Sequence, residues 1–171
     1  LALSGLDGVA RYVASAHPAL HPGQSAQIEV NSAVLGWMGA IHPALVDKLG
    51  LAAGALVFEL ALEPLLRGRL PRFRELSRFP AVRRDIAVVV DNSVSVEAVL
   101  ATIRAAAPAS MQELKLFDLY TGKGIDPGRK SLALGLTLQA DSRTLTDSEV
   151  DAALEAILAA LKTELGATLR D

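Results

Sequence analysis

The sequence predicts an α+β fold in two parts: a fragment of antiparallel sheet, then a domain with the element order β-α-β-β-α-β. Three observations lead to this prediction. The segment Ser77 to Val90 (SRFPAVRRDIAVVV) ends in an apolar, β-branched run that is too short for a useful helix and typical of a buried strand. Residues 130–139 alternate leucine with small or polar side chains. Residues 67–74 (RGRLPRFR) are basic, aperiodic and broken by Gly and Pro, which indicates a domain boundary.

The length and composition limit the classes of protein to consider. The chain of 171 residues is long enough for two small domains, which we place at 1–75 and 76–171. No apolar run reaches the roughly 18 residues that span a bilayer, because Glu59 and Glu63 interrupt the most apolar stretch. We therefore expect a soluble protein with no membrane partner. The chain begins at Leu1 without a signal peptide, and we expect it to be a piece of a longer protein.

Cysteine content and charge add two further constraints. The chain has no cysteine, so it can form neither disulfides nor thiolate metal sites, which fits a reducing compartment. Its net charge of -2 argues against a basic surface over the whole molecule. Any binding site for a nucleic acid must therefore be a local patch.

The first part is expected to hold a sheet fragment with short helices. Residues 6–16 have the spacing of an amphipathic helix, and the His-Pro pairs at 17–18 and 21–22 indicate a turn-rich loop. Alternation and β-branched residues predict strands at 26–30, 34–41 and 56–62, the first two joined by a hairpin turn at Asn31 and Ser32. A short helix is expected over 42–49, closed by Gly50, and another helical turn over 63–66.

The second part carries clearer signals. After the strand that ends at Val90, Ser95 can cap a helix over 96–107 that Pro108 ends. A strand at 113–120, a glycine-rich loop at 121–129 and the leucine-alternating strand follow. The remaining elements are a helix from a capping box at Thr146 and Glu149 to about residue 165, and a short strand at 167–170. This order is the ferredoxin-like plan, in which both helices cover one face of an antiparallel sheet.

The other face of that sheet is the expected binding surface. If the alternation holds, its side chains are Lys115, Phe117, Ser131, Ala133, Gly135, Thr137, Thr168 and Arg170. Beside it we expect a basic rim, since the acids Asp147, Glu149, Asp151 and Glu155 lie on the second helix, away from this face. The rim consists of Arg83, Arg84, Lys123, Arg129 and Lys130. A platform of small side chains with such a rim suits single-stranded RNA. The alternative is that these cations are ordinary solvated residues near strand ends.

Several long segments resemble one family. SRFPAVRRDIAVVV, LFDLYTGKGIDPGRKSLALGLTLQ and TLTDSEVDAALEAILAALKTELGATLRD are similar to the ferredoxin-fold anticodon-binding domain of the β subunit of bacterial phenylalanyl-tRNA synthetase. HPALHPGQSAQIEV, LGWMGAIHPAL and ALVFELALEPLL resemble the end of the non-catalytic, class II synthetase-like module that precedes this domain in the same family. The resemblance covers essentially the whole chain.

The resemblance implies a function. Enzymes of this family join phenylalanine to its tRNA with ATP and Mg²⁺, as an (αβ)2 heterotetramer in the cytoplasm. The α subunit carries the catalytic site, so this fragment is expected to bind the anticodon stem and loop, to do no chemistry itself, and to need no cofactor. The motif positions imply candidate tRNA contacts at Arg83, Arg84, Phe117, Tyr120, Lys123, Arg129 and Lys130. For Phe117 and Tyr120, packing in the core is an equally good interpretation.

Other functions remain as alternatives. The same element order occurs in small-molecule regulatory modules, which would need a ligand cleft between paired domains. A general RNA-recognition motif would show two or three aromatics on its central strands, whereas only Phe117 is expected there. A third alternative is subunit assembly through the sheet of residues 26–66. The histidines of HPALHP lack acidic partners at ligand spacing, so we expect roles in turns, and the GKG of the loop lacks P-loop spacing.

Overall fold

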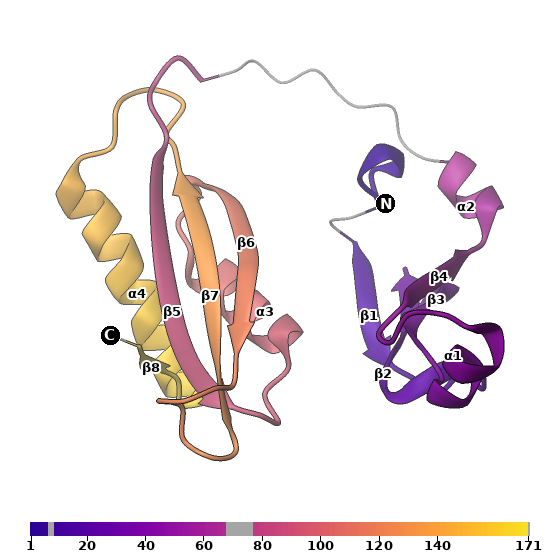
Figure 1. Cartoon of the computed structure of the whole chain (residues 1–171). Helices are drawn as coiled ribbons and strands as arrows, with labels where there is room; N and C mark the ends of the chain where they lie inside the picture. Colours follow the sequence, from indigo (N-terminus) through magenta and orange to yellow (C-terminus); the bar gives the residue numbers. More distant parts are fainter. Residues whose placement is uncertain (7–8, 68–76, 171) are drawn as a thin grey trace. The chain divides into compact units, whose positions relative to one another are not determined.

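The structure is a computed structural model that describes residues 1–6, 9–67 and 77–170. It divides into two compact units, Leu1–Arg74 and Glu75–Asp171 (Figure 1). Residues 68–74 of the predicted linker lie outside the described residues. Each unit is built on its own four-stranded antiparallel sheet.

The first unit is a meander of four strands with short helices. The strands β1 (Ala10–Ala14), β2 (Leu20–Val30), β3 (Ala33–Ile41) and β4 (Leu56–Leu60) lie side by side in chain order. The 3-10 helix η1 (Ala2–Ser4) and the α-helices α1 (Pro43–Leu49) and α2 (Leu62–Leu66) complete the unit. The predicted hairpin turn between β2 and β3 is confirmed, because Asn31 and Ser32 have positive φ angles of 51° and 64°, as a type I′ turn requires.

One sequence-based prediction for this unit was wrong. Residues 6–16 were expected to end an amphipathic helix, but residues 10–14 form β1, which pairs with β2 from Ala10 opposite Val30 to Ala14 opposite Ala26. The pairing gives hydrogen-bond partners to the backbone groups of β1 that face β2, and the β-forming residues Tyr12 and Val13 suit it. Tertiary pairing therefore overrides the helical spacing of the apolar residues.

The second unit has the predicted ferredoxin-like plan. Its elements are β5 (Val82–Asp91), α3 (Val96–Ala106), β6 (Met111–Tyr120), β7 (Arg129–Leu138), α4 (Asp147–Leu165) and β8 (Thr168–Leu169). The strands lie in the order β6-β7-β5-β8 and every neighbouring pair is antiparallel. The expected cap of α3 is present, since the Ser95 hydroxyl accepts a hydrogen bond from the backbone N–H of Ala98 at 3.1 Å.

The core of this unit lies between the sheet and the two helices. The alternate leucines of β7 are fully buried, together with residues from β5, α3 and α4; the core includes Leu132, Leu134, Leu136, Leu138, Val88, Val90, Val99, Ile103, Val150, Ile157 and Leu161. Each such side chain contributes about 1.5–3 kcal/mol by leaving water. Since α3 and α4 both contribute to this one cluster, both helices cover the same face, and no helix among the described residues of this unit covers the opposite face.

The capping box predicted at the start of α4 is present. The Glu149 carboxylate accepts hydrogen bonds from the backbone N–H and the hydroxyl of Thr146, both at 2.9 Å, and it forms an ion pair with Arg143. The hydrogen bond from Arg143, followed by those from Thr146, holds the pKa of Glu149 well below its ordinary range. The helix ends at Gly166, which adopts the left-handed conformation with φ of 60°.

The depressed pKa of Glu149 predicts acid sensitivity. Because its folded pKa lies below the unfolded value of about 4.3, the carboxylate stabilises the fold above that pH and loses this contribution as the pH falls. Denaturant titrations from pH 7 to pH 2 should show a shallower loss of unfolding free energy for Glu149→Gln than for the wild type. Glu155→Gln, an exposed carboxylate on the same helix, is the control. Identical pH profiles for Glu149→Gln and the wild type would contradict the expectation.

Candidate nucleic-acid interface

The face of the second sheet opposite α3 and α4 is called the open face here, and its β7 side chains are all small. Residues directly opposite each other in an antiparallel pair share a face, so the register of β5 and β7 assigns the members. They are Arg83, Asp85, Ala87 and Val89 on β5, opposite Thr137, Gly135, Ala133 and Ser131 on β7. The predicted small and polar face of β7 is therefore confirmed. A flat group such as a nucleic-acid base can approach closely over the alanines and the glycine.

A bulge in β6 decides which of its side chains reach the open face. Leu116 lies opposite Leu134, and Asp118 lies opposite Ala133, so Phe117 is the extra residue between them. Beyond the bulge the alternation is shifted, which places Asp118 and Tyr120 on the open face. Phe117 has no partner on β7, so its placement on this face stays a prediction. Both aromatics are accessible, with Phe117 49% and Tyr120 36% exposed, so neither packs in the core.

The surroundings of Tyr120 hold its ring in one orientation. The phenol hydroxyl donates a hydrogen bond to the carbonyl oxygen of Lys123 at 3.2 Å. A Cβ atom added to Gly122 would lie 2.4 Å from Cζ and Oη of Tyr120, so the ring occupies space that only glycine leaves open there. The guanidinium carbon of Arg170 lies 4.8 Å from the ring centroid, in a cation–π contact. The ring is thus fixed at its edge by the loop and contacted by a cation.

Arg83 lies against the open face near the start of β5. Its Nε donates to Oδ1 of Asp85 at 3.0 Å, and both side chains are largely exposed. A Cβ atom at Gly135 would come within 3.1 Å of the Asp85 oxygen and 3.3 Å of Nη2 of Arg83. The absence of a side chain at Gly135 therefore lets this ion pair lie against the sheet.

Arg84 lies on the other side of the sheet. It alternates with Arg83 and shares the helix-covered face with Ile86, and its Nη2 lies 3.8 Å from Oδ1 of Asp147 at the start of α4. Its Nη1 also donates to the carbonyl oxygen of Arg83 at 3.3 Å. The expectation that both arginines border the open face was therefore wrong for Arg84.

Two of the remaining candidate cations are tied to the backbone. Nη2 of Arg129 donates to the carbonyl oxygens of Val89 at 2.8 Å and Gly166 at 3.3 Å. The Lys130 ammonium donates to the carbonyl oxygen of Asn92 at 3.0 Å. Lys123 is exposed in the loop after β6.

The expected single basic cluster is not formed. Arg83 is near the start of β5, whereas Lys130 lies opposite Val90, seven residues further along that strand. That separation is roughly 23 Å at the usual rise of a strand. The structure therefore brings Arg83 close to Asp85, and Tyr120 close to Lys123 and Arg170, but it does not join the five predicted rim cations.

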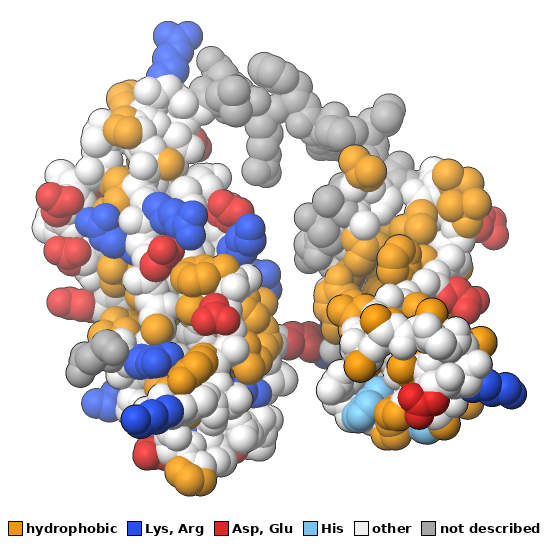
Figure 2. Space-filling view, in the orientation of Figure 1, with side chains coloured by type: hydrophobic (Ala, Val, Ile, Leu, Met, Phe, Trp, Pro, Cys, Tyr) orange, Lys and Arg blue, Asp and Glu red, His pale blue; other side chains and the backbone are white. Residues whose placement is uncertain are grey.

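Charges of both signs occur on the open face. The register places Glu113, Lys115 and Asp118 of β6 there, alongside Arg83 and Asp85 of β5. Figure 2 shows positive and negative side chains interleaved over this unit. The prediction of a purely basic rim was wrong, because it considered the acids of the second helix and did not place Asp85, Glu113 and Asp118 on the open face. Sequence reasoning also missed the contact between Arg170 and Tyr120, for which the sequence gives no local signal.

The three histidines of the first unit have a common structural role. In each His-Pro pair, Nδ1 of the histidine accepts a hydrogen bond from the backbone N–H two residues later, at 3.3 Å for His17, 3.1 Å for His21 and 3.2 Å for His42. The predicted role in turns fits His17, which precedes β2, but it was wrong for His21, which lies within β2, and for His42, which is the N-cap residue of α1. Within the described ranges, no group of three or more His, Asp or Glu side chains is placed to hold a metal ion.

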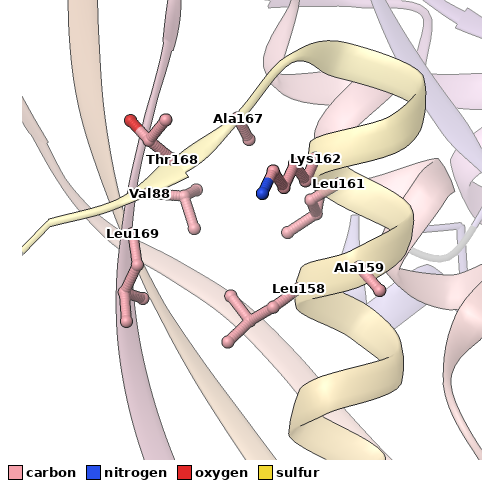
Figure 3. A pocket seen from close by; sticks show the side chains of 8 residues that line it. All are labelled: Val88, Leu158, Ala159, Leu161, Lys162, Ala167, Thr168 and Leu169. Carbon is pink, nitrogen blue, oxygen red and sulfur yellow. The ribbon is translucent and has the colours of Figure 1, made fainter.

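An apolar groove lies at the edge of the second unit, between α4 and β8 (Figure 3). Its volume is about 400 Å³, and apart from Lys162 and Thr168 its lining is apolar: Val88, Leu158, Ala159, Leu161, Ala167 and Leu169. Val88 belongs to the helix-covered face, so the groove is separate from the open face. A lining with one cation and one hydroxyl offers little for recognising a polar metabolite, which disfavours the regulatory-module alternative.

Comparison with known proteins fits this geometry. Residues 77–170, more than half of the chain, match the family described as "Ferredoxin-fold anticodon binding domain". The chain belongs to this family. Residues 1–62 match a second family, described as "Phenylalanyl tRNA synthetase beta chain CLM domain". The resemblance and the ferredoxin-like fold predicted from the sequence are therefore confirmed.

The relatives that match most of the chain share one protein name. The chain is 54% identical over 170 residues to the "Phenylalanine--tRNA ligase beta subunit" of Pseudomonas savastanoi pv. phaseolicola, covering 99% of this chain and 22% of the relative. It is 51% identical over 160 residues to the protein of that name from Nitrosococcus oceani, covering 94% and 20%. The chain thus spans about a fifth of the length of these relatives. Among the helices that the structure describes, none is both long and apolar enough to cross a membrane.

Proposed function

We propose that this chain is a fragment of the β subunit of a bacterial phenylalanine–tRNA ligase, and that its ferredoxin-fold unit binds the anticodon stem and loop of the phenylalanine tRNA. The observation that carries the proposal is the open face, where small side chains adjoin an exposed, oriented tyrosine and an exposed arginine. The match of this unit to an anticodon-binding family and the names of the relatives support it.

Aromatic and small residues give a surface on which unpaired bases can lie. A base stacks on the ring of Tyr120, and stacking of this kind is worth about 1–3 kcal/mol per base. Phe117 offers a second exposed ring at the sheet edge. Ala87 and Ala133, in the centre of the face, leave room for the next nucleotide.

In this proposal the cations of the open face contact RNA phosphates, and its carboxylates contact the edges of bases. The ion pair of Arg83 and Asp85 is exposed, and exposed pairs are worth only about 0–1 kcal/mol, so a phosphate can take the place of Asp85. Lys115 and Lys123 are further exposed cations available to phosphates. Asp85, Glu113 and Asp118 repel phosphates but accept hydrogen bonds from amino groups on base edges. This mixture of charges favours an RNA segment that turns its bases, not its backbone, toward the sheet.

The other candidate cations have supporting roles in this proposal. Arg84 contacts the start of α4, while Arg129 and Lys130 hold backbone carbonyls at the opposite end of the sheet from Arg83. These three residues maintain the shape of the domain, and their contact with RNA is secondary to that of Arg83 and Tyr120.

In the whole enzyme, which we propose to be a cytoplasmic (αβ)2 heterotetramer, phenylalanine is joined to tRNA with ATP and Mg²⁺. The described residues do not fit these groups. The GKG at 122–124 lacks P-loop spacing and leads into a strand, and no carboxylate cluster suited to a metal ion occurs among the residues that the structure describes. The chemistry is therefore assigned to other parts of the enzyme.

Replacing Arg83 tests the RNA interface. Arg83→Gln should weaken binding of the phenylalanine tRNA and reduce the slope of log affinity against log salt by about 0.7–1, because one phosphate contact is lost. Filter binding between 50 and 300 mM salt measures both quantities. Arg104→Gln removes the same charge from an exposed arginine of α3, on the helix side, and should change neither. Equal slopes for Arg83→Gln and the wild type would contradict the proposed interface.

A second proposed role, in assembly, rests on the first unit. One face of its sheet is entirely apolar by register, and several large side chains on it are exposed: Tyr12 (53%), Met38 (39%), Leu56 (74%) and Phe58 (73%). Faces of this kind are normally covered by protein. The relatives extend well beyond the matched region, so we propose that other parts of the synthetase, in the β subunit or the α subunit, cover it.

Exposed apolar surface should make the isolated chain self-associate. Sedimentation of the chain at increasing concentration should show association, which the double variant Leu56→Lys and Phe58→Lys should reduce because it places two charges on the apolar face. Leu49→Lys and Leu66→Lys, at exposed leucines outside the sheet, provide the matched control. A wild-type chain that stays monomeric, or a control that reduces association equally, would contradict the assignment of this face.

A further inference from the structure

The contact between Arg170 and Tyr120 joins two elements that are far apart in the sequence and separated by two strands of the sheet. Tyr120 ends β6 at one edge, and Arg170 follows β8 at the other. The guanidinium lies 4.8 Å from the centroid of the ring, so it occupies a ring face that a base needs for stacking. In the free protein, the guanidinium of Arg170 therefore already covers this face of the Tyr120 ring.

Only the backbone of Arg170 is firmly held. Its N–H donates to the carbonyl oxygen of Ala87 at 2.8 Å, which continues the pairing of β8 with β5. The side chain is exposed, and within residues 1–6, 9–67 and 77–170 no carboxylate forms an ion pair with its guanidinium. The guanidinium can therefore leave the ring without breaking the fold.

The ring, by contrast, stays where it is. Gly122 and the carbonyl of Lys123 fix its position, as described above. Arg129 in turn fixes the chain that carries Arg170, because it bonds to Gly166 just before β8 and to Val89 of the adjacent strand. Arg129 is thus a positioning residue for the contact between Arg170 and Tyr120.

We propose that Arg170 is a mobile cover for the Tyr120 ring, exchanging its cation–π contact for an RNA phosphate when a base stacks on the ring. This inference rests on the proposed function. The exchange is favourable, because an exposed cation–π contact is worth about two- to fivefold in an equilibrium constant. Stacking of a base on an aromatic ring is worth about five- to 150-fold. The released guanidinium then forms a charge-assisted hydrogen bond with the backbone of the same RNA.

The cover predicts an unusual salt dependence. Arg170→Gln removes one phosphate contact, which should lower the slope of log affinity against log salt by about 0.7–1 and weaken binding at low salt. It also uncovers the ring, which should tighten binding by about two- to fivefold at high salt, where the phosphate contact is screened. The two lines should therefore cross, whereas loss of a simple phosphate contact makes them converge without crossing.

A double-mutant cycle tests whether the tighter binding of Arg170→Gln at high salt depends on the Tyr120 ring. The experiment uses the whole 171-residue chain and an RNA hairpin with the anticodon stem and loop of the phenylalanine tRNA. In a Tyr120→Leu background, Arg170→Gln should still lower the salt slope but should give no gain at high salt. Arg170→Lys keeps the charge and should keep the slope. Parallel lines, convergence without crossing, or a gain that persists in the Tyr120→Leu background would overturn the cover.

A measurement without RNA separates this inference from the proposed function. In NMR spectra of the free protein, Arg170→Gln should shift the ring resonances of Tyr120, whereas Arg104→Gln should leave them unchanged. An unchanged Tyr120 ring in Arg170→Gln would overturn the cover even if the wild-type chain binds RNA. A shifted ring together with no salt-dependent binding of the hairpin by the wild type would overturn the proposed function, and with it the exchange.

Discussion

The alternation of side chains along β7 is the constraint on which the rest of the second unit depends. Leu132, Leu134, Leu136 and Leu138 point into the core and hold α3 and α4 on one face. The residues between them are Ser, Ala, Gly and Thr, which leave the other face low and open. Because side chains alternate with a period of two, a slip of one residue would exchange the two faces and expose the leucines. The same residues that stabilise the fold therefore also define the surface available to a ligand.

Departures from that alternation place the candidate side chains for RNA contact. The bulge at Phe117 turns Tyr120 onto the open face, where a regular strand would have turned it toward the helices. Gly122 leaves space for its ring, and Gly135 leaves space for the ion pair of Arg83 and Asp85. The leucines determine which face is open, while one bulge and two glycines determine what is displayed on it.

Much of this architecture could be predicted from the sequence, because its signals are local. Ser95, Thr146, Gly50 and Gly166 mark helix ends through hydrogen bonds and backbone angles formed within a few residues. The bulge, by contrast, depends on pairing with β7 across the sheet, and no residue type in β6 predicts it. Arg84 was placed on the wrong face because the neighbouring run Ile86 to Val90 is apolar throughout and hides the alternation. The hydrogen bonds of the three histidines are also local, because each involves only the backbone N–H two residues later.

The central claim is that the open face, and not the helix-covered face, meets RNA. Backbone amide shifts recorded by NMR while the anticodon hairpin is added to the labelled chain test it most directly. The account predicts that the largest changes fall at Ala87, Ala133 and Thr137 and near Tyr120, with little change along α3 and α4. Changes concentrated on α3 and α4, with Ala87 and Ala133 unaffected, would contradict it.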